Sequence, residues 1–447
     1  MLRKLSRREL VRGIGGVAVA GLAGATMVGR PARAGVGWGT GPNSGLPFWH
    51  GGYSDLDHMV SLLPPGRGLD LIGEFESEGT YLGVATACAN SWGRKRWYLD
   101  FLKTGRTSAF QWSSSPFCSG ASMVVPVSWP ASASAVTAGT HLHCSAPPTY
   151  TGSETAAERA AKQRQVWQIA ADGWLDPIWR QKMLIFKRDF FIKYNLKSIR
   201  IVLRACHELN TATTWGKRDY RRAYGMRELT TVGDYQIVQE ALRRYFAAFL
   251  DVFGNVQASI PNDYAYTDSQ LWPYWNTVKR HNGPVDVRLT CPDNAKLIGP
   301  DNYNFYPAAL TEVAFQASLI ERDRKGWPVG IGPWLEWARS VNKGFALGEW
   351  GLVSKKMNAD GTRPTTQGWD NPIFIKGTLD FCMANAEDIA FISYFNRDNS
   401  VSADLPAHLL KMWDGIDDEF AICARTPPGD NNRCGARAYR QWMAANG

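Results

Sequence analysis

The chain has 447 residues and a formal net charge of +9 at neutral pH. Residues 1–34 carry seven Lys or Arg and one Glu, so removing them lowers the net charge to +3. What remains has no tract of Lys and Arg, and we therefore expect no nucleic-acid partner.

The first 34 residues have the pattern of a bacterial export signal. Arg7 and Arg8 precede an apolar stretch from Gly13 to Val28, and Ala32-Arg33-Ala34 follows it. The arginine pair is typical of a twin-arginine signal. The stretch is too short and too rich in Gly and Ala for a membrane anchor, and no later segment reaches about 18 uninterrupted apolar residues. We expect cleavage, export to the periplasm or the medium, and no membrane contact afterwards.

Residues 35–447 are expected to form a single domain in which short β-type runs alternate with helical patterns. After a Gly-rich lead-in, the strand candidates are Leu46–His50, a second strand between Asp70 and Trp112, Met123–Trp129, Ser198–Cys206, Asn255–Ile260, Lys296–Asp301, Phe345–Glu349 and Ile389–Phe395. Helices are expected over Glu158–Ala171 and over Asp234–Phe253, the second capped by Asp234. Residues 130–158 resemble a long surface loop.

This alternation predicts a parallel sheet, and an eight-stranded (β/α)₈ TIM barrel fits it best. The expected barrel carries an extended N-terminal lead-in and a long loop insertion. An open doubly wound sheet is the structural alternative, but the chain lacks the Gly-rich phosphate turn that often marks one.

All eight cysteines follow the export signal, and an exported protein permits disulfides. Cys423 with Cys434 is the favoured pair, and Cys118 with Cys144 is a weaker one. Cys206 lies in an apolar strand and is expected to be a buried free thiol.

Three of the expected strands end in polar residues after an apolar run, at the end of the strands where a barrel places its active residues. These segments are Cys206–Asn210, Gly299–Tyr303 and Leu347–Gly351, and two of them contain a Glu. A Glu at a strand end is costly unless it is solvated in a cleft or paired. Retaining cleavage of a glycosidic bond uses two carboxylates about 5–5.5 Å apart, and the fourth and seventh strands can bring Glu208 and Glu349 together over the barrel mouth.

The same segments resemble glycoside hydrolase family 26, which includes β-mannanases and some β-glucanases and β-1,3-xylanases. Arg204-Ala-Cys-His207-Glu208-Leu-Asn210 resembles its acid/base segment, Gly348-Glu349-Trp350-Gly351 its nucleophile segment, and Asp301-Asn302-Tyr303 its sixth-strand Asp-x-Tyr. Asp172–Asp176 and Asp370–Ile375 add to the likeness. The resemblance implies that Glu349 is the nucleophile, Glu208 the acid/base, and Tyr303 a hydrogen-bond donor to Glu349.

The resemblance also implies substrate-binding residues. His207 would orient the site, and Asn210 would contact the sugar. Trp215, Trp350, Tyr394 and Phe395 are candidate stacking platforms, each with an ordinary core role as the alternative. Where family mannanases continue with Gly and a nearby Trp, this chain has Thr211–Thr214 before Trp215, so mannan, mixed-linkage glucan, xylan and bacterial exopolysaccharide all remain open.

The sequence therefore predicts an exported, monomeric, endo-acting enzyme that cleaves a β-linked polysaccharide by double displacement, with neither a metal nor an organic cofactor. Both carboxylates have a structural role as the alternative to catalysis. Glu208 would then pair with Arg204 or His207, and Glu349 would cap a turn. Two other functions stay open: a catalytically silent barrel that binds glycans, and an exported protein loaded with a metal or cofactor. The cluster His141-x-His143-Cys144 has ligand residue types but is too small to indicate a metal site.

Overall fold

The computed structural model describes part of the chain. The described residues are 37–54, 56–75, 101–114, 153–196, 199–205, 226, 228–254, 269–275, 285–304, 309, 311–352, 354–355, 371–396, 408–409 and 435–447. They belong to the unit Val36–Gly447.

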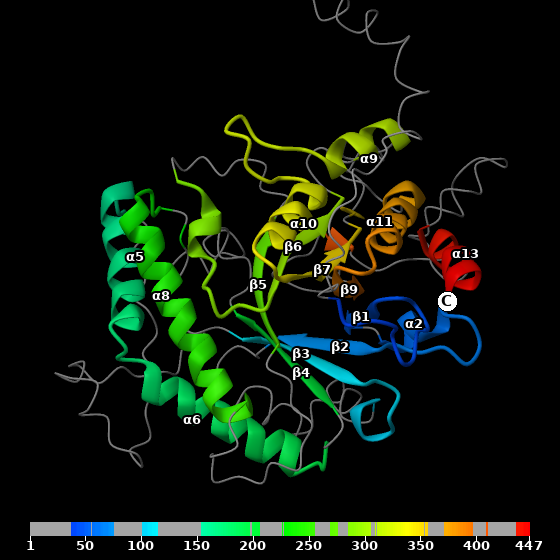
Figure 1. The fold of residues 1–447 in the computed structure, drawn as a ribbon, viewed down its shortest axis with the longest axis horizontal. Coiled ribbons are helices and arrows are strands. Elements are labelled where there is room, and N and C mark those ends of the chain that lie inside the picture. The colour runs from blue at the N-terminus through cyan, green and yellow to red at the C-terminus, as the bar shows by residue number, and fades with distance from the viewer. Residues whose placement is uncertain are drawn as a thin grey trace, which may run out of the picture. The chain divides into compact units, whose positions relative to one another are not determined.

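Eight parallel strands close into a barrel in the order β1-β2-β3-β4-β5-β6-β7-β9, as the sequence predicts (Figure 1). The strands are β1 (Trp49–Ser54), β2 (Leu71–Phe75), β3 (Ala109–Ser114), β4 (Arg200–Ala205), β5 (Ser269–Trp275), β6 (Leu297–Tyr303), β7 (Gly344–Gly351) and β9 (Ile389–Asn396). The barrel closes where β1 pairs with β9 over the whole of β1. Two short strands, β8 (Ser354–Lys355) and β10 (His408–Leu409), pair separately.

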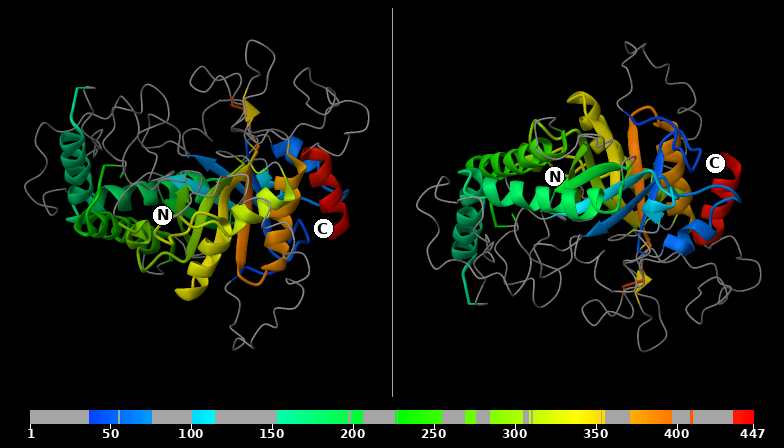
Figure 2. Two further views of the ribbon diagram at one scale, coloured as in Figure 1. Left: turned by 90° about the horizontal axis from the view of Figure 1, so that it is seen from above. Right: turned by 90° about the horizontal axis from the view of Figure 1, so that it is seen from below.

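Helices surround the strands. They are α2 (Leu56–Ser61), α5 (Ala156–Ala171), α6 (Asp176–Phe186), α8 (Val232–Phe249), α9 (Glu312–Leu319), α10 (Ile331–Ser340), α11 (Pro372–Ala384) and α13 (Gly435–Asn446). Figures 1 and 2 show α5, α6 and α8 on one side of the barrel and α11 and α13 on the opposite side. None of the helices in the described part of the chain is long and apolar enough to cross a membrane.

The start of α8 corrects one expectation. Its N-cap is Thr231, and Asp234 is the third residue of the helix. The Thr231 side chain accepts a hydrogen bond from the Asp234 N–H, and the Asp234 carboxylate accepts one from the Thr231 N–H. This reciprocal capping box places the helix start two residues earlier than the pattern predicts.

Strands β4, β6, β7 and β9 lie where the sequence predicts them, but other strands differ. The first strand begins at Trp49 rather than Leu46. The fifth strand, which pairs with β4, is Ser269–Trp275 rather than Asn255–Ile260. The predicted strands Met123–Trp129 and Asn255–Ile260 lie outside the described residues. Pro273 lies within β5, and its sequence therefore does not indicate a strand, because proline lacks the N–H that a strand interior needs.

The barrel interior is apolar at the amino ends of the strands. One buried cluster fills it there: Trp49, Leu71, Ala109, Val202, Leu297, Ala346, Ala390 and Phe391. Trp38 from the lead-in packs against this cluster, with its ring 5.2 Å from those of Trp49 and Phe391. The lead-in thus seals one end of the barrel, and the inward-facing polar residues lie toward the other.

Cys291 and Cys382 are buried free thiols, and burial raises the pKa of Cys291 to about 12. The other six cysteines, including both expected pairs and Cys206, lie outside the described residues.

Candidate active site at the carboxyl ends of the strands

The carboxyl half of β7 contains a bulge that determines where Glu349 points. Against β6, the register moves from Ile298–Phe345 to Asn302–Trp350, so β7 has one residue more than its partner. The register against β9 shows the same extra residue between Leu347 and Trp350. An extra residue reverses which side chains face inward beyond it. Ala346 therefore points into the barrel below the bulge, and Glu349 points into it above.

A glycine on the neighbouring strand accommodates this irregular backbone. A Cβ atom at Gly299 of β6 would lie 1.5 Å from the Ala346 carbonyl oxygen, which no side chain could tolerate. Glycine at this position lets β6 and β7 approach closely just before the bulge.

Glu349 is buried, with 3% of its surface exposed, and its two carboxylate oxygens face different donors. Arg204 Nη1 from β4 donates to Oε2 at 2.7 Å, and the Tyr303 hydroxyl from β6 donates to Oε1. A cation and a phenol thus stabilise negative charge on this carboxylate from two other strands.

Arg204 is completely buried and also contacts a second carboxylate. Its Nη2 donates to Asp301 Oδ2 from β6. Burial acts to lower the pKa of Arg204, but the charges of Asp301 and Glu349 outweigh it and hold the pKa well above the ordinary value. Arg204 therefore stays charged and joins the carboxylates of two adjacent strands.

Two of the predicted site residues, Tyr303 and Glu349, meet in this cluster. His207, Glu208, Asn210 and Trp215 lie outside the described residues, so their roles remain predictions.

Trp350 and Tyr394 are fully buried and pack against each other, with ring centroids 5.0 Å apart and planes at 89°. Trp350 also lies 6.4 Å from Phe374 of α11, in the layer between the strands and the helices. Both belong to the main hydrophobic core, and Tyr394 accepts a hydrogen bond from the Leu352 N–H. The expectation that they form sugar platforms is therefore wrong for these side chains, because a ring enclosed on every side cannot stack on a ligand. The bulge explains this arrangement: when Glu349 faces inward, Trp350 must face outward.

Phe395 occupies the inward position on β9 instead. Its ring is 5.8 Å from that of Tyr53 of β1, whose hydroxyl contacts Gln111 inside the barrel. Of the aromatic candidates on β7 and β9, Phe395 is the one on the same side of the sheet as Glu349.

Two residues of the cluster have larger roles than the sequence predicts. The sequence suggests Arg204 only as an alternative partner for Glu208, and it gives Asp301 no role of its own. The available signal is an arginine inside an apolar run. Arg204 shares a face of β4 with Val202, which belongs to the cluster in the barrel interior, so Arg204 points into the barrel as well. A cation there requires carboxylates from facing strands.

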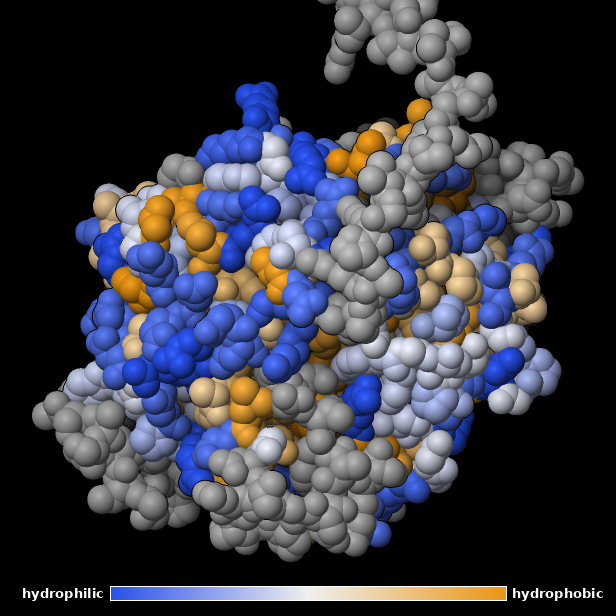
Figure 3. Space-filling view, in the orientation of Figure 1, coloured by the Kyte–Doolittle hydropathy of each residue, from blue (hydrophilic) through white to orange (hydrophobic). Residues whose placement is uncertain are grey.

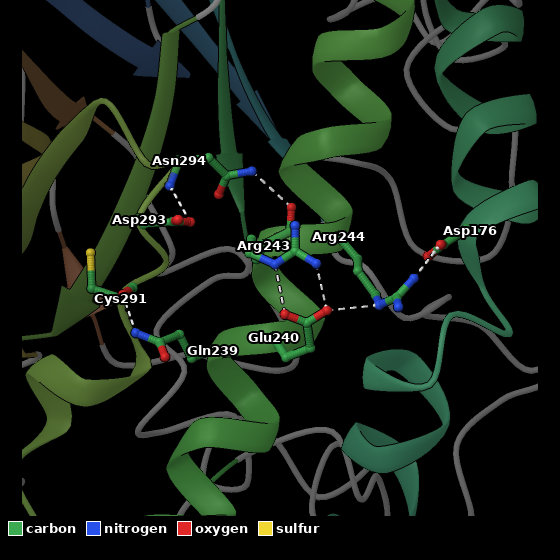
Figure 4. Close-up of polar contacts among 8 residues, drawn as sticks. All are labelled: Asp176, Gln239, Glu240, Arg243, Arg244, Cys291, Asp293 and Asn294. Atoms are coloured by element: carbon green, nitrogen blue, oxygen red, sulfur yellow. Dashed lines mark hydrogen bonds and ion pairs between the residues drawn. The ribbon is translucent and has the colours of Figure 1, made fainter.

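A second polar cluster lies outside the barrel and has a structural role (Figure 4). Arg244 of α8 contacts Asp176 at 2.7 Å and Glu240 at 3.0 Å, and Arg243 makes a bidentate pair with Glu240. Asn294 donates to the Arg243 carbonyl oxygen at 2.9 Å. These contacts hold the start of α6 and the segment before β6 against α8. The Asp172–Asp176 resemblance therefore marks a packing element.

Within the described residues, no group of three or more His, Cys, Asp or Glu could hold a metal ion. The cluster at His141 and His143 lies outside those residues.

The surface has apolar residues in separate patches (Figure 3), one of them over the region where Figure 1 places α9. On that helix Val313 is 81% exposed, and Ile320, which follows it, is 73% exposed.

No family model matches the sequence, and no curated protein matches it significantly. Solved structures of family 26 glycoside hydrolases are similar in fold. A family 26 enzyme from Muricauda sp. MAR_2010_75 is 13% identical over 79% of each chain, with a TM-score of 0.40. A double mutant of a Cellulomonas fimi endo-β-1,4-mannanase is 12% identical over 89% of this chain and 70% of that one, with a TM-score of 0.46. Bacillus subtilis mannanase man26 is 12% identical over 83% and 90%, with a TM-score of 0.42.

Proposed function

We propose that this chain is an exported retaining glycoside hydrolase that cleaves a β-linked polysaccharide internally. The observation that carries the proposal is Glu349 itself. A bulge turns this carboxylate into the barrel at the carboxyl end of β7, where Arg204 and Tyr303 each donate to one of its oxygens. Barrel enzymes place their reacting groups at this end of the strands.

In the proposed mechanism, Glu349 attacks the anomeric carbon and forms a glycosyl–enzyme ester. Arg204 and Tyr303 orient the attacking carboxylate. The sequence segment that follows β4 supplies Glu208 as the acid that protonates the leaving oxygen. Glu208 then deprotonates the water that hydrolyses the ester, so the configuration at the anomeric carbon is retained.

The experiment is product analysis on a panel of mannan, mixed-linkage glucan, xylan and bacterial exopolysaccharides, with the product anomer followed by NMR. Glu349→Ala should lower kcat by roughly 10⁴–10⁶-fold, as loss of a nucleophile does in other covalent enzymes. Added azide should rescue it with inverted product. Glu208→Ala should lower activity on the natural substrate by about 10²–10⁴-fold and, with azide and an activated aryl glycoside, give retained product.

Glu336→Ala is the matched control, because Glu336 makes an exposed ion pair with Arg322 on the outer surface. It should leave activity unchanged. Glycan binding without turnover by the wild-type protein would favour the silent binding barrel. Activity that depends on a metal would favour the loaded export cargo.

Export is part of the same proposal and rests on residues 1–34 alone. Changing Arg7 and Arg8 to Lys together should leave precursor in the cytoplasm. Unchanged export of that variant would indicate the general secretory route.

A further inference from the structure

We propose that Gln111 is a positioning residue that holds the β7 bulge in the form that presents Glu349. This inference rests on the proposed function, in which Glu349 is the nucleophile. Gln111 is completely buried in the barrel interior, and its Nε2 donates to the Gly348 carbonyl oxygen at 3.0 Å. Gly348 is the residue directly before Glu349, inside the bulge.

The contact spans the barrel. In the strand order, β3 and β7 are four places apart in either direction, so they face each other across the interior. In a regular sheet, hydrogen bonds between neighbouring strands hold the backbone in place. The bulge shifts the register of β7 against both of its neighbours, β6 and β9. A bulge interrupts the regular ladder, and a donor from a side chain can then stabilise a buried backbone carbonyl within it. Gln111 supplies that donor from the opposite wall.

The orientation of the Gln111 amide is determined by chemistry. The Gly348 carbonyl can only accept, so the amide nitrogen must face it. The same nitrogen contacts the Tyr53 hydroxyl of β1. Tyr53 has room for its ring because position 73 on β2 is glycine, where a Cβ atom would lie 2.2 Å from that ring. Gln111 is thus itself held in place by Tyr53.

Arg204 and Tyr303 contact the Glu349 side chain, whereas Gln111 contacts the backbone behind it. Loss of the Gln111 contact should therefore let the bulge relax and turn the carboxylate away from its donors, without removing any group that touches substrate. Misplacement of a reacting group by about 1 Å can cost on the order of 10²-fold in rate.

The test compares Gln111→Met with Gln163→Met. Both glutamines are fully buried, but Gln163 lies in α5, where its Oε1 accepts from the Glu228 N–H at 2.9 Å. We expect Gln111→Met to lower kcat per folded molecule by about 10–10²-fold with little change in KM, and Gln163→Met to leave kcat unchanged. Equal kcat values for the two variants would overturn the proposal.

Gln111→Glu adds a readout that a purely structural role would not move. An ionised carboxylate repels the Gly348 carbonyl, whereas the protonated acid can donate to it. The activity of Gln111→Glu relative to wild type should rise as the pH falls, and that of Gln111→Met should not. Identical pH profiles would overturn the proposal.

A crystal structure of Gln111→Met separates this inference from the proposed function. Glu349 should lose its contacts with Arg204 and Tyr303, whatever the protein hydrolyses. If the bulge and both contacts persist, Gln111 does not position Glu349. If wild type cleaves no glycan yet the bulge relaxes in the variant, the proposed function fails and the structural role of Gln111 stands.

Discussion

Strand β4 carries an arginine at each end, and the two have opposite surroundings. Arg200, at the amino end, lies between aromatic rings, with its guanidinium carbon 4.4 Å from the Trp38 ring and 4.6 Å from the Trp49 ring. Arg204, four residues further along the same strand, lies between the carboxylates of Asp301 and Glu349. Burial lowers the pKa of Arg200, whereas the carboxylates raise that of Arg204.

The difference shows that the two ends of one strand can have different roles in a barrel. At the amino end the cation is only part-buried and covers aromatic surface, which seals the interior. At the carboxyl end the cation is fully buried and organises anionic groups from two other strands. A buried charge network adds little stability by itself, so its presence at the carboxyl end favours a chemical role there.

The largest effect should come from removing the buried cation. Arg204→Met leaves the Asp301 and Glu349 carboxylates buried side by side, which should cost about 3–5 kcal/mol of unfolding free energy and abolish most of the activity. Urea unfolding and turnover of the folded fraction would measure the two effects separately.

Arg200→Met is the control on the same strand. It removes a cation from aromatic rings and should cost only about 0.5–2 kcal/mol, with kcat unchanged. Equal losses of stability and activity in the two variants would mean that the two ends do not differ in the way proposed.

The second prediction concerns Trp350 and Phe395. Trp350→Ala empties a buried site beside Phe374 and should lower the unfolding free energy by about 3–5 kcal/mol. Phe395 is also largely buried, with 6% of its surface exposed, but it faces the barrel interior on the side of Glu349. Phe395→Ala should therefore weaken polysaccharide binding as well as lower stability. Thermal unfolding together with binding isotherms would distinguish them. Loss of glycan binding in a stably folded Trp350→Ala would restore Trp350 as a sugar platform.

A smaller effect than the loss of Arg204 or of Trp350 is a pH dependence of stability that comes from the amino end of the barrel. His50 of β1 is fully buried, and this lowers its pKa to about 4 from an ordinary 6.5. Its Nε2 lies 2.8 Å from the Tyr439 hydroxyl of α13, a phenol whose pKa is raised well above its ordinary value by burial, so that phenol stays neutral. The unfolded chain therefore binds a proton that the folded one does not, and stability should fall as the pH drops from about 6.5 to about 4, by at most about 3 kcal/mol.

Asp70, which accepts a hydrogen bond from the His50 N–H, acts in the opposite direction. Burial raises its pKa, so the folded state takes up a proton above the pH at which the unfolded state does, and stability gains as the pH falls. Urea midpoints of wild type and His50→Gln across this range isolate the histidine. The variant should lose less stability on acidification, and parallel curves would contradict the assignment.

The elements that the sequence predicted correctly each carry a strong hydrophobic pattern. The apolar runs of β4, β6, β7 and β9 and the apolar face of α8 predicted those elements, because buried strands and amphipathic helices carry strong periodic patterns. The strand-end Glu349 and the nearby Tyr303 followed from the same strands. The part of the site that could be predicted consists of the polar residues at the ends of these strands.

The sequence did not predict the features that depend on a local irregularity of a strand. The bulge of β7 cannot be inferred from Gly348-Glu349-Trp350, since strict alternation leaves open which of the two larger side chains faces inward. Proline 273 concealed β5, and the partners of Arg204 depend on which strands face each other across the barrel. The partners of Arg204 are thus a consequence of closure, which no short window of sequence contains.

The closure of the barrel also sets an order of events for the growing chain. β1 has β9 as one neighbour, and His50 meets Tyr439, which lies 389 residues further along. The first strand to be synthesised therefore keeps an unpaired edge until almost the whole barrel exists. Contacts this remote in sequence form slowly, and an open strand edge can pair with another copy of the chain in the meantime. Rapid overproduction should therefore favour aggregation through β1, whereas slow synthesis or dilute refolding should give it time to find β9.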